Sequence, residues 1–135
     1  MSKHAIIVIK NNNRYLQYYD LRWDSYLFLN CKLLDNNMLE VVTDFVSKSL
    51  NIDKKYIKVK YIDFKVHKKF SESAKVEKEY THYFYQVKVL DNLPSSDFII
   101  NNIQYKWFTY NELLNNKRIM TVNSDIVGFI KEFNM

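Results

Sequence analysis

The chain has 135 residues, of which 47% are hydrophobic, and a formal net charge of +5. This length and apolar content suit one self-sufficient core, so we expect a single domain over residues 1–135. Gly128 is the only glycine, which excludes phosphate sites that need a glycine-rich loop. Cys31 is the only cysteine, which excludes an intramolecular disulfide. Neither a signal peptide nor an apolar segment of membrane length is visible, so we expect a cytoplasmic protein with no membrane contact.

The first half of the chain predicts a hairpin, a third strand and a helix. Apolar alternation and β-branched residues predict the strands, and the asparagines at 11–13 suit the hairpin turn. After a polar loop over Asn30–Asn37, an apolar stripe at helical spacing predicts a helix, capped by Asp35, Asn36 or Asn37. The expected strands and helix are Lys3–Lys10, Arg14–Tyr19, Tyr26–Leu29 and Met38–Leu50.

The second half predicts a long hairpin, short strands and two terminal helices. The alternation in Tyr56–His67 changes phase near Tyr61-Ile62, which indicates a bulge. A charged loop over Lys68–Lys78 separates this strand from its partner, and asparagine pairs at 101–102 and 115–116 suit later turns. The last helix is expected to be capped by Asn123 or Ser124. The remaining expected elements are Glu79–Leu90, Phe98–Ile100, Gln104–Thr109, Asn111–Asn115 and Asp125–Phe133.

The segment Leu27–Ile52 has the layout of a phosphate-and-metal site: an apolar strand, a polar loop, an amphipathic helix and an apolar exit. It resembles the Nudix box of MutT-like pyrophosphohydrolases, which places a glycine, a glutamate, an Arg-Glu pair, a Glu-Glu pair and a second glycine at fixed spacings. An ungapped count anchored on Val46 and Ile52 puts other residues at all of these positions. They are Asn30, Asn36, Asp44-Phe45, Lys48-Ser49 and Asn51. With a loop one residue shorter, Cys31 replaces the first glycine and Lys32 takes a position where many members carry lysine.

The resemblance implies a fold and a lost reaction. The order of elements, together with Thr81–Tyr85 and Tyr105–Leu113, resembles the Nudix fold, an α/β (α+β) arrangement: an α/β/α sandwich with a mixed, mainly antiparallel sheet. The family's helix carboxylates hold magnesium, which needs oxygen ligands. Phe45 offers no lone pair, Lys48 repels a cation and Ser49 is a weak neutral ligand. We therefore expect no metal site, no cofactor and no magnesium-dependent diphosphate cleavage.

An atypical hydrolase is the first alternative. Glu40 and Asp44 lie one turn apart on the predicted helix, and Glu77 or Glu79 could extend toward them to hold magnesium. The plainer interpretation is an exposed helix face on which Asp44 pairs with Lys48, worth a few tenths of a kcal/mol.

Aromatic residues favour a binding function instead. Tyrosine, phenylalanine and tryptophan make up 16% of the chain, more than a small core usually needs, and their flat rings suit base stacking. By the same resemblance we expect a nucleotide-like ligand in a pocket beside the predicted helix, with candidate ligand-binding residues Tyr18, Tyr26, Phe84, Trp107 and Lys32. The second alternative is a protein-interaction or homodimerisation scaffold with an exposed aromatic patch.

The segment 54–78 concentrates positive charge, with nine lysines against Asp63, Glu72 and Glu77. Such a segment favours an acidic macromolecule, RNA or a nucleotide. Lysines on an edge strand that prevent sheet-to-sheet aggregation explain the same pattern. His67 and His82 lack further ligands at metal spacing, and Cys31 lacks an assignable base, so neither set predicts a catalytic centre.

Overall fold

The structure, a computed structural model, describes residues 2–33, 38–71 and 75–135. Its strands are β1 (Ser2–Asn11), β2 (Arg14–Asp20), β3 (Ser25–Lys32), β4 (Ile57–Ser71), β5 (Val76–Val89), β6 (Phe98–Ile100) and β7 (Ile103–Thr109). Its helices are α1 (Met38–Leu50), α2 (Tyr110–Asn115) and α3 (Lys117–Glu132), with a short 3₁₀ turn, η1 (Lys54–Tyr56). None of the helices in the described part of the chain has both the length and the apolar content that a membrane span requires.

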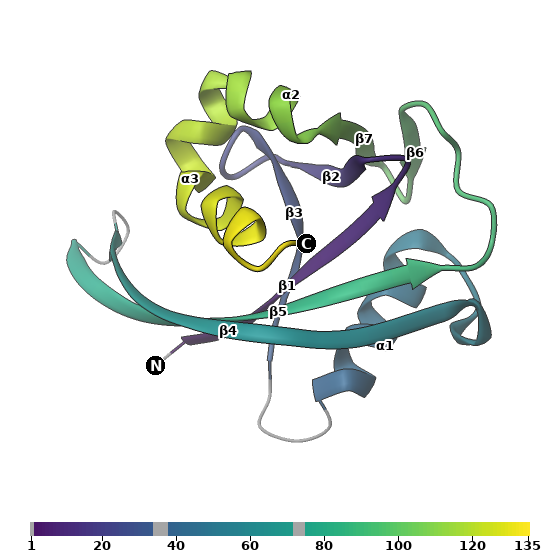
Figure 1. Cartoon of the computed structure of the whole chain (residues 1–135), viewed down its shortest axis with the longest axis horizontal. Coiled ribbons are helices and arrows are strands. Elements are labelled where there is room, and N and C mark those ends of the chain that lie inside the picture. Colours follow the sequence, from purple (N-terminus) through teal and green to yellow (C-terminus); the bar gives the residue numbers. More distant parts are fainter. Residues whose placement is uncertain (1, 34–37, 72–74) are drawn as a thin grey trace.

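All of these strands join one mixed sheet in the order β4-β5-β1-β3-β2-β7-β6 (Figure 1). β1 pairs with β5 in parallel, and the other described strand pairs are antiparallel. α1 packs on one side of the sheet, hereafter the α1 face, and α3 packs on the other, the α3 face (Figure 1). The predicted α/β/α sandwich with a mixed, mainly antiparallel sheet is confirmed.

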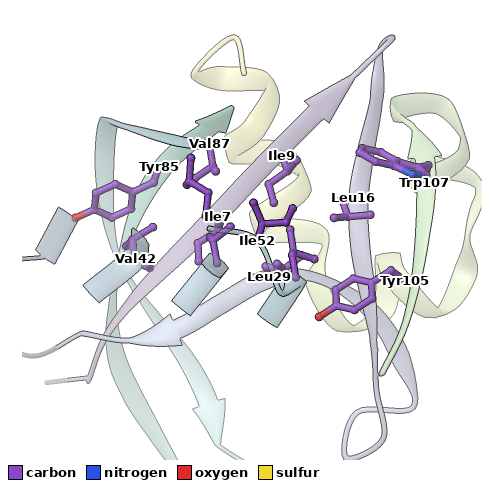
Figure 2. Packing of buried hydrophobic residues seen from close by; sticks show 14 of the residues in the cluster. Ile7, Ile9, Leu16, Leu29, Val42, Ile52, Tyr85, Val87, Tyr105 and Trp107 are labelled. Atoms are coloured by element: carbon purple, nitrogen blue, oxygen red, sulfur yellow. The ribbon is translucent and has the colours of Figure 1, made fainter. Parts of the chain in front are cut away.

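Two apolar clusters fill the space between the sheet and its helices, and β1 supplies both. Ile7 and Ile9 point to the α1 face, where they share one apolar cluster with Val42 of α1 and with Ile52 (Figure 2). Ile6 and Val8 point to the α3 face. This division follows from the alternation of side chains along a strand. Because both faces of β1 are covered, residues 5–9 of this strand are all apolar and show no alternation with polar residues.

Asparagine supplies the left-handed turns that glycine usually makes. Asn12 and Asn13 have φ values of 51° and 61°, and Asn101 and Asn102 have 53° and 64°, as the sequence predicts. Asn51, at the position of the last box glycine, has φ of 55°. The amide of Ile52 donates to the Ser47 carbonyl at 3.1 Å, which completes a Schellman-type end of α1.

The β4–β5 hairpin is longer than the sequence indicates, because pairing continues to Ser71 and Val76 and replaces most of the expected loop over Lys68–Lys78. The predicted bulge is confirmed. Tyr61 pairs with Tyr85 and Asp63 with Phe84, so Ile62 is the extra residue.

The last helix begins earlier than predicted. The side chain of Asn116, not Asn123 or Ser124, caps α3 by accepting from the Ile119 amide at 2.9 Å. Ile119 is buried on the α3 face, and this packing supports a first turn that the sequence pattern alone does not show. Asn123, with φ of −138° and ψ of 25°, forms a kink that divides α3 into two helical parts, and the predicted helix over Asp125–Phe133 corresponds to the second part. The predicted caps of α1, Asp35, Asn36 and Asn37, lie outside the described residues.

Candidate ligand pocket beside helix α1

A cavity of about 410 Å³ opens beside α1. This volume lies in the range of small-molecule sites. Residues from β1, β2, β3, α1, β7 and the β2–β3 turn form its walls. They are His4, Tyr18, Arg22, Leu29, Asn30, Cys31, Lys32, Phe45, Ser49, Ile103 and Tyr105.

Aromatic side chains make the apolar walls of the cavity. Phe45 projects from α1, and Tyr105 comes from β7. The Tyr105 ring stacks on Phe98 with centroids 5.1 Å apart, and its hydroxyl donates to the Ser49 carbonyl at 3.3 Å. Tyr105 is thereby fixed in the cavity wall by both its ring and its hydroxyl.

A chain of hydrogen bonds joins the cavity to the β2–β3 turn. The Asn30 amide donates to the Tyr18 hydroxyl at 3.2 Å, and Tyr18 donates to the Asp20 carboxylate at 2.8 Å. The same carboxylate accepts from the amides of Arg22 and Trp23 at 2.9 and 3.1 Å. Burial, and then the bond to Asp20, raise the pKa of Tyr18, so its phenol keeps its proton and acts as a donor. The network therefore fixes the turn that carries Arg22.

The cavity walls carry positive charge and no negative charge among the described residues. Arg22 and Lys32 are the cationic side chains of the lining, and both are exposed to solvent. Burial, and then the charge of Lys32, lower the pKa of His4, so its imidazole is uncharged at neutral pH. An anionic group is the ligand that this lining favours electrostatically.

Comparisons with known proteins give matches at the level of structure. No protein-family model matches the sequence, and no curated protein matches it. The structure is similar to the C. elegans Ap4A hydrolase, with a TM-score of 0.63 and 13% identity over 99% of this chain and 96% of that one. It is similar to the E. coli dihydroneopterin triphosphate pyrophosphohydrolase, with a TM-score of 0.64 and 12% identity over 91% and 95%.

A Nudix-family hydrolase from Clostridium perfringens matches with a TM-score of 0.55 and 10% identity, over 95% of this chain and 97% of that one. The protein has the Nudix fold. In this Nudix fold, α1 is the helix that the box resemblance assigns to the metal-binding glutamates. Phe45 and Ser49, which the ungapped count places at glutamate positions, both line the cavity, whereas Lys48 does not.

The described donor set does not fit the magnesium that this fold implies. Glu40 is exposed and does not line the cavity. Asp44 also lies outside the lining. The sequence suggested that Asp44 pairs with Lys48, but in the structure it pairs with the Lys54 ammonium. Within residues 2–33, 38–71 and 75–135, no three histidine, cysteine or acidic side chains converge as a metal site. A hard cation would meet Phe45 and Ser49 where it needs carboxylates.

Glu77 and Glu79 are far from the two acids of α1. Both are exposed and belong to the outer part of the β4–β5 hairpin, where Glu79 pairs with Lys68. About 20 Å of extended strand separate Glu79 from Tyr85 along β5. Tyr85 belongs to the apolar cluster under α1. The structure therefore does not bring together the four carboxylates of the atypical-hydrolase alternative.

Of the five predicted ligand-binding residues, Tyr18 and Lys32 line the cavity. Phe84 is buried on the α3 face, against Phe133 with ring centroids 5.1 Å apart. Tyr26 also packs with the α3-face cluster. Trp107 is buried on the α1 face, where its indole donates to the Pro94 carbonyl at 2.8 Å. These three side chains serve the core instead of the cavity.

Sequence reasoning missed Arg22, His4 and Tyr105 as cavity residues. Arg22 lies two residues after Asp20 in a turn, and nothing in its immediate sequence shows that this turn borders a cavity. The spacing of Phe45 and Ser49, one helical turn apart, was a usable signal that both share a helix face. Cys31 also lines the cavity, but burial raises the pKa of its thiol to about 11, which opposes a nucleophilic role.

Proposed function

We propose that the protein binds a nucleotide-like anion in the cavity beside α1 and does not cleave diphosphates by metal catalysis. One observation supports this proposal above others. The cavity combines aromatic walls from Tyr18, Phe45 and Tyr105 with the cations Arg22 and Lys32, and its described lining contains no carboxylate. Flat apolar walls and a cationic rim suit a ligand with an aromatic ring at one end and a phosphate at the other.

The chemistry of the lining supports each half of such a ligand. Stacking of a base on an aromatic side chain is worth roughly 1–3 kcal/mol. The Arg22 guanidinium can hold two phosphate oxygens at once, and Lys32 adds a point charge. Asn30 and Ser49 are neutral hydrogen-bonding groups for the sugar or the base edge. Solved structures with this fold include an Ap4A hydrolase and a UDP-X diphosphatase, both of which are named for phosphate-bearing substrates.

A thermal-shift screen of nucleotides with and without magnesium tests the proposal. We expect at least one nucleotide to raise the melting temperature in the presence of EDTA, because a ligand that binds only the folded state stabilises it. Arg22→Gln and Lys32→Gln should reduce that shift. Lys68→Gln removes the same charge from the outer β4–β5 hairpin and should leave the shift unchanged. Absence of any shift across the screen would contradict ligand binding.

The atypical hydrolase predicts a different result from the same samples. Magnesium or manganese alone should then raise the melting temperature, and a nucleoside diphosphate derivative should release a nucleoside monophosphate or phosphate. Asp44→Asn and Glu40→Gln should abolish that release. Turnover that depends on both metal and these carboxylates would replace our proposal.

A second candidate function, association through the β4–β5 hairpin, has its own supporting observation. Phe64, Val66 and Phe70 are 49%, 49% and 65% exposed. They lie an even number of residues apart on β4, so their side chains share one face of the strand. Such a row of exposed apolar side chains is typical of an interaction site. Concentration-dependent elution on a sizing column, reduced by Phe64→Ser, is the expected result. Elution as a monomer at all concentrations would exclude homodimerisation.

A further inference from the structure

The lysines of the segment 54–78 do not form one surface in the fold, and two groups of them differ in their surroundings. One group forms ion pairs with the helices: Lys54 of η1 pairs with Asp44 of α1, and Lys69 of β4 pairs with Asp125 of α3 at 2.8 Å. Lys65 pairs likewise with Glu132 of α3. These lysines already have acidic partners, so the sequence segment as a whole is not a free cationic surface.

The second group lies at the end of the sheet near η1. Lys58 pairs with Lys88 across β4 and β5, and Lys60 pairs with Gln86 in the next row on the same face. Gln86 also pairs with Val8 of β1, which belongs to the α3-face cluster. Directly paired residues share a face of the sheet, so these lysines point to the α3 side.

Lys10 adds a third strand to this group. It follows Ile9, which pairs with Val87, and it pairs with Tyr15, a residue of the α3-face cluster. Its ammonium lies 5.3 Å from the centre of the Tyr15 ring. All four lysines of this group are exposed, so α3 does not cover this end of the sheet. We call the group the basic end patch; it consists of Lys10, Lys58, Lys60 and Lys88.

The pairing of Lys58 with Lys88 costs stability in the isolated chain. Like charges directly opposite each other on two strands repel, and a row of lysines on three adjacent strands adds to that repulsion. Asp63 lies on the same face one row closer to the hairpin turn, and Glu132 of α3 is paired with Lys65. Prevention of edge aggregation explains lysines on β4 but not those on β1 and β5, which lie inside the sheet.

We propose that the basic end patch binds the phosphodiester backbone of a nucleic acid. Lysines bind phosphates as point charges, and a polyanion relieves repulsion between several of them at once. The four patch lysines offer no aromatic face and no guanidinium fork, so backbone contact without sequence preference is the expected mode. The patch is on the α3 side of the sheet and shares no residue with the cavity beside α1, so the two binding activities are separable.

Fluorescence anisotropy with labelled single-stranded and duplex oligonucleotides of several sequences tests this inference. We expect the logarithm of the association constant to fall linearly with the logarithm of the salt concentration. The affinity should vary little with the sequence of the oligonucleotide. Lys58→Gln with Lys88→Gln should lower the salt slope by about 2 for duplex, since each phosphate contact contributes about 0.9. The matched control, Lys68→Gln with Lys78→Gln, removes the same charge from the outer hairpin and should retain the wild-type slope.

Three results would overturn the inference. One is no binding of either oligonucleotide at low salt, and another is an equal loss in the patch and control variants, which indicates general charge attraction. The third is that an acidic peptide of equal charge binds as tightly as the oligonucleotides. That result would assign the patch to an acidic protein. Comparison of the single-stranded and duplex arms identifies which phosphodiester form the patch prefers.

Discussion

His67 and His82 face each other across β4 and β5, with Nε2 of His67 2.6 Å from Nδ1 of His82. Nδ1 of His67 lies 3.4 Å from the Asp125 carboxylate of α3. Because the carboxylate only accepts, we infer that Nδ1 of His67 donates to it, and neutral His67 must then accept at Nε2 from His82. The two rings therefore form an uncharged hydrogen-bonded pair between the sheet and α3.

Acid should weaken this pair and destabilise the fold. Burial, and then the charges of His67 and Lys69, lower the pKa of His82 from 6.5 to about 4, while Asp125 opposes the shift and His4 adds slightly to it. Burial also lowers the pKa of His67. As the pH falls below about 6.5 the unfolded chain takes up protons that the folded chain excludes, so the free energy of unfolding falls until about pH 4. We expect a loss on the order of 1–3 kcal/mol.

Urea unfolding across this pH range checks the expectation, with His82→Gln as the control. The variant lacks the depressed histidine and should show a flatter decline between pH 6.5 and pH 4. Carboxylates contribute to acid unfolding in both proteins, so the difference between the curves isolates the histidine. Parallel curves would show that His82 does not carry the effect.

The end of α1 should be sensitive to the residue at position 51. Asn51 has φ of 55°, a left-handed conformation that a β-carbon disfavours and that asparagine tolerates. Asn51→Ala should lower the free energy of unfolding by roughly 1 kcal/mol, whereas Asn51→Gly should be neutral or slightly stabilising. Chemical denaturation of the two variants measures this difference. Equal stabilities would mean that the left-handed turn is not populated.

Phe84 should affect stability rather than ligand binding. Its ring is fully buried on the α3 face, so Phe84→Ala should cost about 3–5 kcal/mol of unfolding free energy. Any nucleotide-induced rise in melting temperature should persist in the folded variant. Phe64→Ala, at a side chain that is 49% exposed, is the matched control and should cost far less. Loss of the nucleotide effect in a still-folded Phe84→Ala would place this ring at the ligand.

Cys31 should react slowly in the folded protein. Burial raises the pKa of its thiol to about 11, so very little thiolate exists at neutral pH. Ellman's reagent should modify the folded chain much more slowly than the chain unfolded in guanidinium. Comparable rates in the two states would show that the thiol is more accessible and more acidic than its place in the cavity wall indicates.

Local sequence patterns predicted much of the fold because they report local physics. Alternation predicted the strands of the β4–β5 hairpin and the bulge at Ile62. Asparagines predicted left-handed turns at 12–13 and 101–102. The pattern failed at the start of α3, where the burial of Ile119 supports a helical turn whose sequence lacks a clear apolar period. Helix starts that depend on tertiary packing are not encoded in neighbouring residues.

The sequence by itself determined that α1 carries a phenyl ring, an ammonium and a hydroxyl at the positions that the Nudix resemblance gives to glutamates. Tertiary structure decided which aromatic residues meet that helix: Tyr18 and Tyr105 line the cavity, and Phe84 is on the far side of the sheet. It also assembled Lys10 and Lys88 with Lys58 from three strands. The physical reason is that alternation assigns a side chain to one of two faces, whereas strand order and register determine which face is covered, and by which helix.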